Sequence, residues 1–220
     1  MEREIIITAD GSSTIHLPEW NEQYHSKHGA IQEAMHVFIK SGLQLFSNQN
    51  ISILEIGFGT GLNSFITFLE APKLNLTIDY VGVEAYPVAA NEIENLNYVA
   101  ELKAENFQEV FTQMHQSKWE QKELISNGFN LTKQQLFFNE IKDENRFDLI
   151  YFDAFGARVQ PELWTEDIFE IMFNSLKKGG ILVTYSAKGS VRRAMQAVGF
   201  KVERLPGPPG KREMLRAFKE

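Results

Sequence analysis

The hydrophobic positions of this chain follow two periods that alternate between residues 51 and 198. Short, nearly continuous apolar runs are typical of buried strands, and four of them lie at residues 51–56, 78–83, 147–152 and 181–185. Apolar residues that recur every three or four positions are typical of amphipathic helices, and such segments lie at residues 62–69, 161–176 and 190–198. Strands that alternate with helices predict an α/β fold with a doubly wound parallel sheet.

The first 46 residues carry different patterns. Residues 5–9 and 14–17 favour strands, and the Asp-Gly-Ser-Ser sequence between them favours a turn, so together they predict a small β-hairpin. Apolar positions at helical spacing follow, and Ser26 is the expected cap of this helix. We expect residues 1–46 to pack, as a hairpin plus a helix, on a main domain of residues 47–220.

The middle of the chain is the least regular part. We expect a helix at residues 99–116, preceded by a helix that Pro87 opens, and a strand near residues 130–138. The chain is predicted to end in an antiparallel strand pair, joined by a Pro-Gly-Pro-Pro-Gly turn, at residues 200–205 and 214–218.

Composition narrows the class of protein. The 220 residues are 43% hydrophobic and 23% charged, which is the balance of an ordinary globular domain. The absence of cysteine excludes disulfides, thiolate metal sites and cysteine nucleophiles. No apolar run approaches the ~20 residues of a membrane span, and the charged start is unlike a secretory signal. We therefore expect a cytoplasmic protein without a membrane partner.

The net charge of −7 is unevenly distributed. Residues 188–220 contain nine Lys and Arg against three acids, a net charge of +6, so the rest of the chain is strongly acidic. The acidic total argues against a nonspecific nucleic-acid binder. The basic segment leaves two interpretations open, a solvated C-terminal surface or a local site for a polyanion.

The sequence Glu-Ile-Gly-Phe-Gly-Thr-Gly joins the first buried strand to a helix, where parallel sheets bind their ligands. Dinucleotide loops read Gly-x-Gly-x-x-Gly and hold a pyrophosphate, whereas Gly57, Gly59 and Gly61 are spaced Gly-x-Gly-x-Gly. Glu55 would repel a pyrophosphate and suit an ammonium group, and Glu84, which ends the next strand, can accept both hydroxyls of an unphosphorylated ribose. A ligand with an ammonium group and a ribose but no phosphate indicates S-adenosylmethionine; glycines that serve only packing are the alternative.

Asp153 follows the buried run at residues 147–152, so we expect its side chain at the reactive end of the same ligand. It either accepts the ammonium of the cofactor or an amine of the substrate, or caps a helix. Tyr24 and His25 precede the first long helix, and for both a contact with the cofactor or a base competes with ordinary packing. His25 and His28 have no third metal ligand at useful spacing, so we expect no metal site.

Four motifs stand in order along most of the chain, and they are Gly57-Phe58-Gly59-Thr60-Gly61-Leu62-Asn63, Asp153-Ala154-Phe155, Pro161-Glu162-Leu163-Trp164-Thr165 and Lys211-Arg212-Glu213-Met214. With these motifs the chain resembles the methyltransferases of the MnmD type, whose domain also forms the N-terminal half of bifunctional MnmC proteins. The resemblance implies a Rossmann-like class I methyltransferase sheet, S-adenosyl-L-methionine as cofactor and Asn63 among its contacts. It also implies tRNA as partner, with methylation of the 5-aminomethyl group of wobble (2-thio)uridine to 5-methylaminomethyl-(2-thio)uridine.

Within this resemblance, Asp153 and Tyr24 are the expected catalytic residues. An alkylamine with a pKa of about 10 must lose a proton before it can attack a methyl group, and Asp153, or a water that it holds, is expected to remove it. Phe155 is expected to contact the substrate, and Tyr185 is expected to stack on the uracil. Five cations are expected at RNA phosphates or at the rim of the RNA site, namely Lys188, Arg192, Arg193, Lys211 and Arg212.

The chain departs from the family in two places. Gly156 stands where relatives often carry Ala-Pro, and residues 117–146 lack the usual polar contact to adenine. Because the chain ends at Glu220, we expect methylation without the flavin oxidase step of the bifunctional relatives.

Three other functions stay open. A methyl- or aminopropyltransferase for a small-molecule amine fits the N-terminal hairpin, but such an enzyme needs acids, not nine cations, to hold its substrate. A nicotinamide oxidoreductase is disfavoured by Glu55 and the glycine spacing. A noncatalytic binding module is disfavoured by the glycine loop together with Glu84 and Asp153. The sequence leaves the oligomeric state open.

Overall fold

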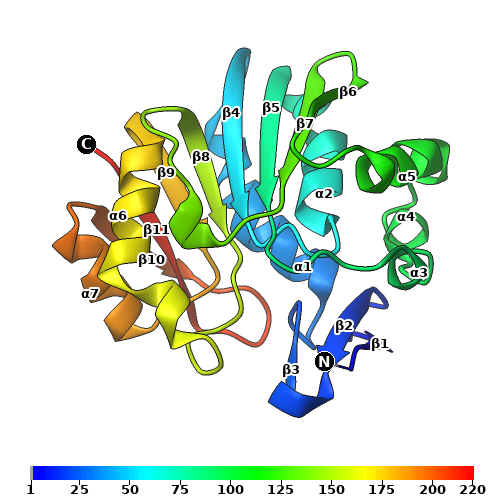
Figure 1. Ribbon diagram of the computed structural model, residues 1–220, viewed down its shortest axis with the longest axis horizontal. Helices are drawn as coiled ribbons and strands as arrows, with labels where there is room; N and C mark the ends of the chain where they lie inside the picture. The colour runs from blue at the N-terminus through cyan, green and yellow to red at the C-terminus, as the bar shows by residue number, and fades with distance from the viewer. Residues whose placement is uncertain (1) are drawn as a thin grey trace.

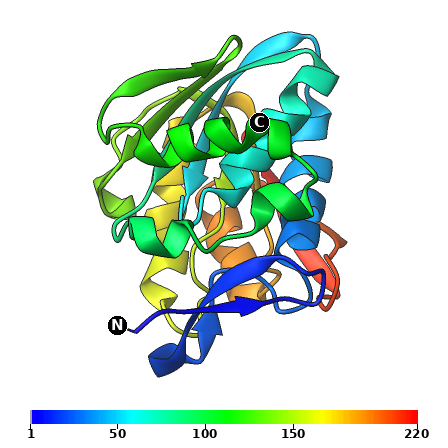
Figure 2. The ribbon, with the colours of Figure 1, turned by 90° about the vertical axis from the view of Figure 1, so that its right-hand side faces the viewer.

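The computed structural model describes residues 2–220, and its main element is a twisted eight-stranded sheet with helices on both faces (Figure 1, Figure 2). Its parallel strands are β4 (Gln49–Ile56), β5 (Leu76–Val83), β7 (Phe129–Gln134), β8 (Phe147–Phe152) and β9 (Leu176–Thr184). Antiparallel strands at the two edges are β6 (Lys122–Ser126), β10 (Lys201–Pro206) and β11 (Glu213–Phe218). Across residues 2–220 the order is β10-β11-β9-β8-β4-β5-β7-β6. The predicted α/β fold and its C-terminal strand pair are confirmed.

The parallel strands pack between two hydrophobic cores, because successive side chains of a strand point to opposite faces. In β4, Ile53 belongs to one core and Leu54 to the other. The first core includes residues of α1 (Ala30–Ala34), α2 (Leu62–Glu70), α4 (Tyr98–Glu101) and α5 (Gln108–Gln116). The second includes residues of α6 (Glu166–Ser175) and α7 (Gly189–Ala197). Burial on both faces explains why these strands are nearly continuous apolar runs.

A small antiparallel sheet precedes the main one and consists of β1 (Glu4–Ile7), β2 (Ser13–Leu17) and β3 (Glu22–Gln23). β1 and β2 form the predicted hairpin, and β3 adds a strand that the sequence pattern does not indicate. Two arginines tie this sheet to the rest of the chain: Arg158 Nη2 lies 3.2 Å from the carbonyl oxygen of Trp20, and Arg3 Nη2 lies 3.2 Å from that of Tyr86. The division of the chain at residue 46 stays a prediction.

The first predicted helix is less regular than expected. α1 continues as a π-helical turn at Met35–Lys40, and a 3₁₀ turn follows at Leu43–Leu45. The N-cap position is occupied by Gly29 and not by Ser26. The hydroxyl of Ser26 instead accepts a hydrogen bond from the backbone N–H of His28, so it orders the loop before the helix.

Two predictions in the middle of the chain are corrected. The helix expected at residues 99–116 is broken, because Lys103 adopts a left-handed conformation (φ 52°) between α4 and α5. Pro87 does not open a helix: α3 (Ala90–Ile93) begins three residues later, with Ala89 as its N-cap residue.

Two element boundaries also differ from the prediction. The helix expected at residues 161–176 is a 3₁₀ turn (Pro161–Trp164) followed by α6. The Lys-Lys-Gly-Gly sequence expected to end it is part of β9, where the N–H of Gly179 donates to the carbonyl of Lys219. The strand expected near residues 130–138 ends earlier and pairs with β6, which the pattern does not indicate.

Short 3₁₀ turns complete the chain and lie at Pro18–Trp20, Ala71–Leu74, Glu105–Phe107 and Phe138–Glu140. Proline stands in the first turn of two of them, where its missing N–H leaves no bond unmade. Of the helices in residues 2–220, none is both long enough and apolar enough to cross a membrane.

Candidate active site

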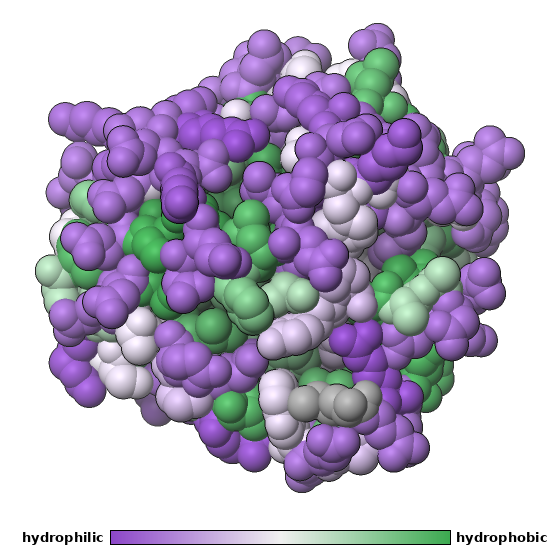
Figure 3. Space-filling model, in the orientation of Figure 1, coloured by the Kyte–Doolittle hydropathy of each residue, from purple (hydrophilic) through white to green (hydrophobic). Residues whose placement is uncertain are grey.

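A cleft of about 1350 Å³ opens at the carboxyl ends of β4, β5, β7 and β8. The chain places β5 and β7 on one side of β4 and then returns to place β8 on the other, and such sheets bind ligands at this reversal. The segment between β2 and α1 forms a facing wall. Small-ligand pockets typically measure ~300–1,000 Å³, so this cleft has room for two ligands side by side. The face of the molecule shown in Figure 3 is mostly hydrophilic, with separate hydrophobic patches to the left and to the right of its middle.

Glycines form the loop after β4 because side chains would not fit there. Gly57, Gly59 and Gly61 have φ values of 86°, 49° and 71°, in the left-handed region. A Cβ on Gly57 would lie 2.7 Å from the carbonyl oxygen of Asp153, and a Cβ on Gly59 would lie 3.1 Å from the ring of Tyr24. Gly57 and Gly59 line the cleft, and Gly61 is the N-cap residue of α2. The loop therefore presents bare backbone to a ligand.

Glu84 follows β5 and holds the glycine loop in place. Its Oε2 accepts a hydrogen bond from the N–H of Gly59 over 3.1 Å, and its Oε1 accepts one from the N–H of Tyr86 over 2.9 Å. Burial raises the pKa of this carboxyl. Glu84 also lines the cleft, in the place where the sequence predicts an acceptor for ribose hydroxyls.

Asn63 connects the two carboxylates for which the sequence predicts contact with an ammonium group. Its Nδ2 donates to Glu55 Oε1 and to Asp153 Oδ2, each over 2.9 Å. Glu55 is 1% exposed and its other oxygen accepts from the hydroxyl of Tyr80, so it lies behind Asn63 instead of in the cleft. Asn63 itself lines the cleft, and its buried Oδ1 has no partner within residues 2–220. Glu55 therefore holds Asn63 in place, and it can act on a ligand only through Asn63.

Asp153 directly follows β8 and lines the cleft. Its backbone N–H donates to the carbonyl of Ile56 over 2.9 Å, which anchors it to β4. Burial raises the pKa of its carboxyl to about 7 and the charge of Glu33 adds to this, whereas the Asn63 hydrogen bond and the charge of Lys211 oppose it. Such a carboxyl gains and loses a proton near neutral pH. The helix-cap interpretation finds no support, since the side chain is bonded to Asn63.

Aromatic side chains form one wall of the cleft. The ring centroid of Phe155 lies 5.7 Å from that of Trp20 and 5.0 Å from that of Tyr24, both in edge-to-face geometry. Burial raises the pKa of Tyr24 to about 12, so its hydroxyl stays protonated near neutral pH and can donate a hydrogen bond. His25 Nδ1 lies 3.0 Å from Thr14 Oγ1, and burial lowers the pKa of His25 to about 4, so this ring is neutral.

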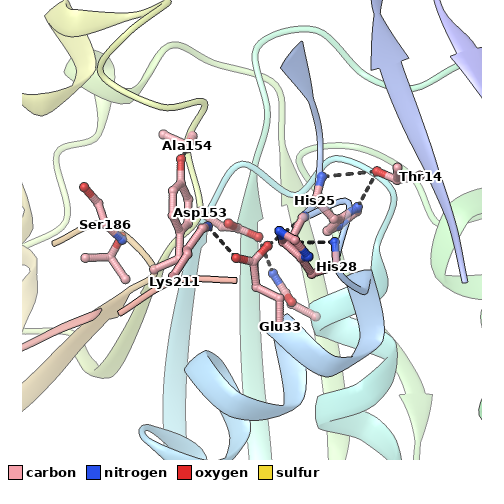
Figure 4. A network of polar contacts seen from close by, with 12 residues as sticks. Thr14, His25, His28, Glu33, Asp153, Ala154, Ser186 and Lys211 are labelled. Carbon is pink, nitrogen blue, oxygen red and sulfur yellow. Dashed lines mark hydrogen bonds and ion pairs between the residues drawn. The ribbon is translucent and has the colours of Figure 1, made fainter. Parts of the chain in front are cut away.

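Lys211, one of the predicted RNA contacts, lies close to Asp153 (Figure 4). Neither Lys211 nor Tyr185, which the sequence predicts to contact the substrate, is among the described residues that line the cleft. The hydroxyl of Tyr185 donates to the carbonyl of Ala154 over 2.8 Å, and Lys211 Nζ lies 3.8 Å from the centroid of the Tyr185 ring. Lys211 Nζ also forms an ion pair with Glu33. The structure therefore turns Lys211 inward, where the sequence predicts a cation on an RNA-facing rim, and covers one face of Tyr185.

The remaining predicted RNA contacts are found on the surface. Lys188 is the N-cap residue of α7, Arg192 and Arg193 lie in that helix, and Arg212 lies between β10 and β11. Arg192 is half-buried and the other three are exposed. Within residues 2–220, none of these four cations takes part in an ion pair. This distinguishes them from neighbours such as Arg216, which pairs with its strand partner.

Sequence reasoning does not identify two parts of this site. Residues 137–140 line the cleft after β7, and Phe137 packs against Tyr86 at its mouth with ring centroids 5.9 Å apart. They lie in the segment where the sequence shows no adenine contact, and the Phe137-Phe138 pair at the end of the predicted strand is the available signal. Glu33 is the second part, and its position in an amphipathic helix does not distinguish it from a solvent-facing residue.

Residues 99–220, more than half of the chain, match a family model described as "S-adenosyl-L-methionine-dependent methyltransferase". The "tRNA 5-methylaminomethyl-2-thiouridine biosynthesis bifunctional protein MnmC" of Leptospira borgpetersenii is 30% identical over 217 residues, covering 89% of this chain and 32% of that protein. The protein of the same name from Delftia acidovorans is 29% identical over 218 residues, covering 93% and 33%. The chain thus spans about a third of the length of these relatives.

Solved structures give the same picture of the fold. MNMC2 from Aquifex aeolicus superposes with a TM-score of 0.79 at 25% identity, covering 100% of this chain and 70% of that one. Spermidine synthase from Thermotoga maritima superposes with a TM-score of 0.60 at 14% identity, covering 99% and 68%. The second likeness concerns the fold alone.

Proposed function

The chain belongs to the S-adenosyl-L-methionine-dependent methyltransferases, and on that premise we propose that it methylates the 5-aminomethyl group of wobble (2-thio)uridine in tRNA. The product is 5-methylaminomethyl-(2-thio)uridine. The observation that carries the proposal is the position of Asp153, whose carboxylate can accept a proton from an amine. Asn63 holds this carboxylate beside the glycine loop, and Phe155 and Tyr24 line the same cleft. The two bacterial relatives are named for the biosynthesis of 5-methylaminomethyl-2-thiouridine in tRNA, which supports the same product. The sheet is the expected Rossmann-like class I methyltransferase sheet.

The cleft suits a cationic cofactor better than a pyrophosphate. Among the described residues that line it, Arg3 is the one Lys or Arg, whereas the acids are Glu84, Glu92, Glu140, Asp153, Glu162 and Asp167. Glu84 would hold the ribose hydroxyls, and Asn63 would face the ammonium group of the methionine part. The buried Oδ1 of Asn63, unpartnered in the described chain, is an acceptor that this ammonium would satisfy. This donor and acceptor set fits S-adenosyl-L-methionine and disfavours a nicotinamide dinucleotide.

When bound, S-adenosyl-L-methionine supplies an electrophilic methyl group on a sulfonium. The substrate amine, with a pKa of about 10 in water, arrives protonated and has no lone pair for attack. Asp153 takes one proton from this ammonium; the freed nitrogen then forms an N–C bond while the S–C bond to the methyl group breaks. A secondary ammonium and a neutral thioether result. Phe155 and Tyr24 line the cleft together with Asp153, and the face of an aromatic ring attracts an ammonium group.

The basic surface supports an RNA substrate. Of the nine cations in residues 188–220, five form no ion pair in the described chain, and they are Lys188, Arg192, Arg193, Arg212 and Lys219. Lys219 instead donates hydrogen bonds to Asn145 Oδ1 and to the carbonyl of Leu176, which leaves the first four for other contacts. Unpaired guanidinium and ammonium groups are free to contact phosphates, which give affinity but carry no sequence information. Lys188, Arg192 and Arg193 belong to the first turns of α7, directly after β9 and thus at the carboxyl edge of the sheet, where the cleft lies.

The proposal is tested by methyl transfer from labelled S-adenosyl-L-methionine to two tRNA pools, followed by nucleoside analysis. One pool comes from cells that lack this methylation, and the other comes from normal cells. We expect label in 5-methylaminomethyl(-2-thio)uridine with the first pool and none with the second. Absence of label in both pools, although the cofactor binds, would contradict the proposal.

The acid-lined cleft also favours a second candidate, transfer to a free small-molecule amine. Six carboxyl groups around one arginine, counted over the described cleft residues, would attract a polyamine as well as a cationic cofactor. Incubation of the enzyme with labelled cofactor and a set of polyamines distinguishes the two candidates. Transfer to polyamines without transfer to tRNA would favour the small-molecule enzyme.

A further inference from the structure

A partly buried ion pair lies next to Asp153 and joins distant parts of the chain (Figure 4). Glu33, on α1, has a side chain that is 8% exposed, and Lys211, between β10 and β11, has one that is 32% exposed. Lys211 Nζ lies 2.5 Å from Glu33 Oε1. Removing two charges from water costs free energy that their attraction often does not recover, so packing alone does not explain the pair.

Each member of the pair is connected to a part of the cleft. Glu33 Oε2 accepts a hydrogen bond from the backbone N–H of Ser26 over 2.9 Å, which fixes the end of the segment that carries Tyr24. Lys211 Nζ lies against the ring of Tyr185, whose hydroxyl donates to the carbonyl of the residue after Asp153. Glu33 thus contacts the segment that carries Tyr24 through Ser26, and Lys211 contacts the end of β8 that carries Asp153 through Tyr185. These two segments are the two sides of the amine site, the part of the cleft next to Asp153 where the substrate amine would bind.

The pair also contributes opposite charges to the surroundings of Asp153. The charges that act on its carboxyl are those of Glu33 of α1 and Lys211 of the β10–β11 turn. The charge of Asp153 in turn raises the pKa of three neighbouring groups, Glu55 of β4, Tyr80 of β5 and Tyr185 after β9. Glu33 favours the protonated form of Asp153, and Lys211 favours the ionised form. Loss of either partner leaves the other as an uncompensated charge.

We propose that Glu33 and Lys211 are positioning residues for Asp153: they hold the two sides of the amine site in register and balance the charge next to the Asp153 carboxylate. This inference rests on the proposed function of Asp153 as proton acceptor. Neither residue lines the cleft in the described part of the chain, so each acts through Asp153 or its neighbours.

The test compares Glu33→Gln with the double variant Glu33→Gln/Lys211→Met and with Lys211→Arg, all in the full chain. The first readout is the pH dependence of single-turnover methyl transfer to tRNA. The second is the titration of carboxyl-¹³C-labelled aspartate by NMR, in which Asp153→Asn assigns the signal. The second readout needs no substrate, so it remains informative if tRNA is not methylated.

Glu33→Gln removes the negative charge and leaves Lys211 unpaired next to Asp153. We therefore expect the acidic limb of the pH–rate profile and the midpoint of the Asp153 NMR titration to move down by about one pH unit. In the double variant both midpoints should return most of the way to their wild-type values, and in Lys211→Arg they should stay at the wild-type values. Removal of the exposed pair Lys201–Glu220 is the matched control and should leave both readouts in place.

Wild-type midpoints in Glu33→Gln and in the double variant would overturn the inference, even if their rates were lower at every pH. A loss of folding in Glu33→Gln is recognised by the melting temperature and by cofactor binding. Lys211→Met alone then carries the test, because it leaves Glu33 as the uncompensated charge and should move both midpoints up, whereas wild-type midpoints would again overturn the inference. If wild-type enzyme methylates no tRNA but the NMR midpoints shift as expected, the proposed substrate fails and the charge balance stands.

Discussion

At the scale of single residues, the surroundings of Asp153 decide its chemistry. Asp153→Asn keeps an acceptor for Asn63 Nδ2 but cannot take up a proton. We expect methyl transfer to fall by roughly 10²- to 10⁴-fold, with much smaller changes in the binding of cofactor and tRNA. Single-turnover rates and binding isotherms measure the two effects separately. Wild-type transfer by this variant would remove Asp153 from the reaction.

The same carboxyl links folding stability to pH. Its pKa is about 7 in the folded protein, against 3.8 for an ordinary aspartate, so over this interval the folded state holds a proton that the unfolded state has lost. The contribution to stability is present below the unfolded value and is lost as the pH rises through about 7. We therefore expect the melting temperature of wild type to fall, relative to that of Asp153→Asn, between about pH 5 and about pH 8. Parallel melting curves over this range would contradict the assignment.

Some residue roles follow from position in the sequence and others do not. Glu84 and Asp153 directly follow their strands, so a strand boundary read from the sequence already places them at the ligand edge. Glu55 lies inside β4, one residue before its end. Its contact with a ligand depends on Asn63 and Tyr80, which belong to other elements, and the sequence pattern cannot show that they enclose it.

At the scale of elements, the glycine loop makes a specific prediction. Gly59→Ala places a Cβ in the left-handed region and 3.1 Å from the ring of Tyr24. We expect a loss of about 1–2 kcal/mol in stability from backbone strain, together with weaker binding of S-adenosyl-L-methionine. Calorimetric titration and thermal melting measure the two effects.

Gly128→Ala is the control for this experiment. Gly128 has a φ of 91°, and a Cβ on it would meet nothing within 4 Å. It lies in the turn between β6 and β7, outside the residues described as lining the cleft. Stability should fall here too, with cofactor affinity unchanged. Equal loss of affinity in both variants would show that strain alone, and not the loop's place in the cleft, explains the effect.

The parallel strands could be predicted from the sequence because burial on both faces requires apolar residues at successive positions. Elements with one solvated face were harder to predict. β6 carries polar residues on an edge of the sheet, and the first part of β9 contains two lysines, one of which, Lys177, pairs with Asp148 over 2.8 Å. The break at Lys103 results from its left-handed backbone conformation, which the helical spacing of the neighbouring apolar residues does not predict.

At the scale of the whole molecule, the uneven charge predicts how tRNA binding responds to salt. Each phosphate contact contributes roughly 0.7–0.9 to the slope of log affinity against log salt. Arg192→Ala/Arg193→Ala removes two unpaired cations, so we expect weaker binding and a slope that is shallower by about 1–2. Filter binding over a range of salt concentrations gives this slope.

A second pair of cations serves as the reference for this measurement. Lys201 and Arg204 lie on β10 and pair with Glu220 and Glu213, respectively. Their replacement by Ala changes the formal charge by the same amount, yet it should leave the slope nearly unchanged. Equal effects of both double variants would mean that net charge, and not contact at α7, governs the affinity. The sequence indicates the basic segment, but only the ion pairs show which of its cations are free.

The ion pair between Glu33 and Lys211 also determines when, during synthesis of the chain, the surroundings of Asp153 can be completed. Its members are 178 positions apart, so a nascent chain can form the glycine loop and the Asp153 strand long before the cation of the pair has been made. Contacts at such separation close late, because the entropy of closing the intervening chain opposes them. The site around Asp153 is therefore completed only after the turn between β10 and β11 has been made, and a chain that stops before this turn would bind cofactor without the full arrangement that readies Asp153.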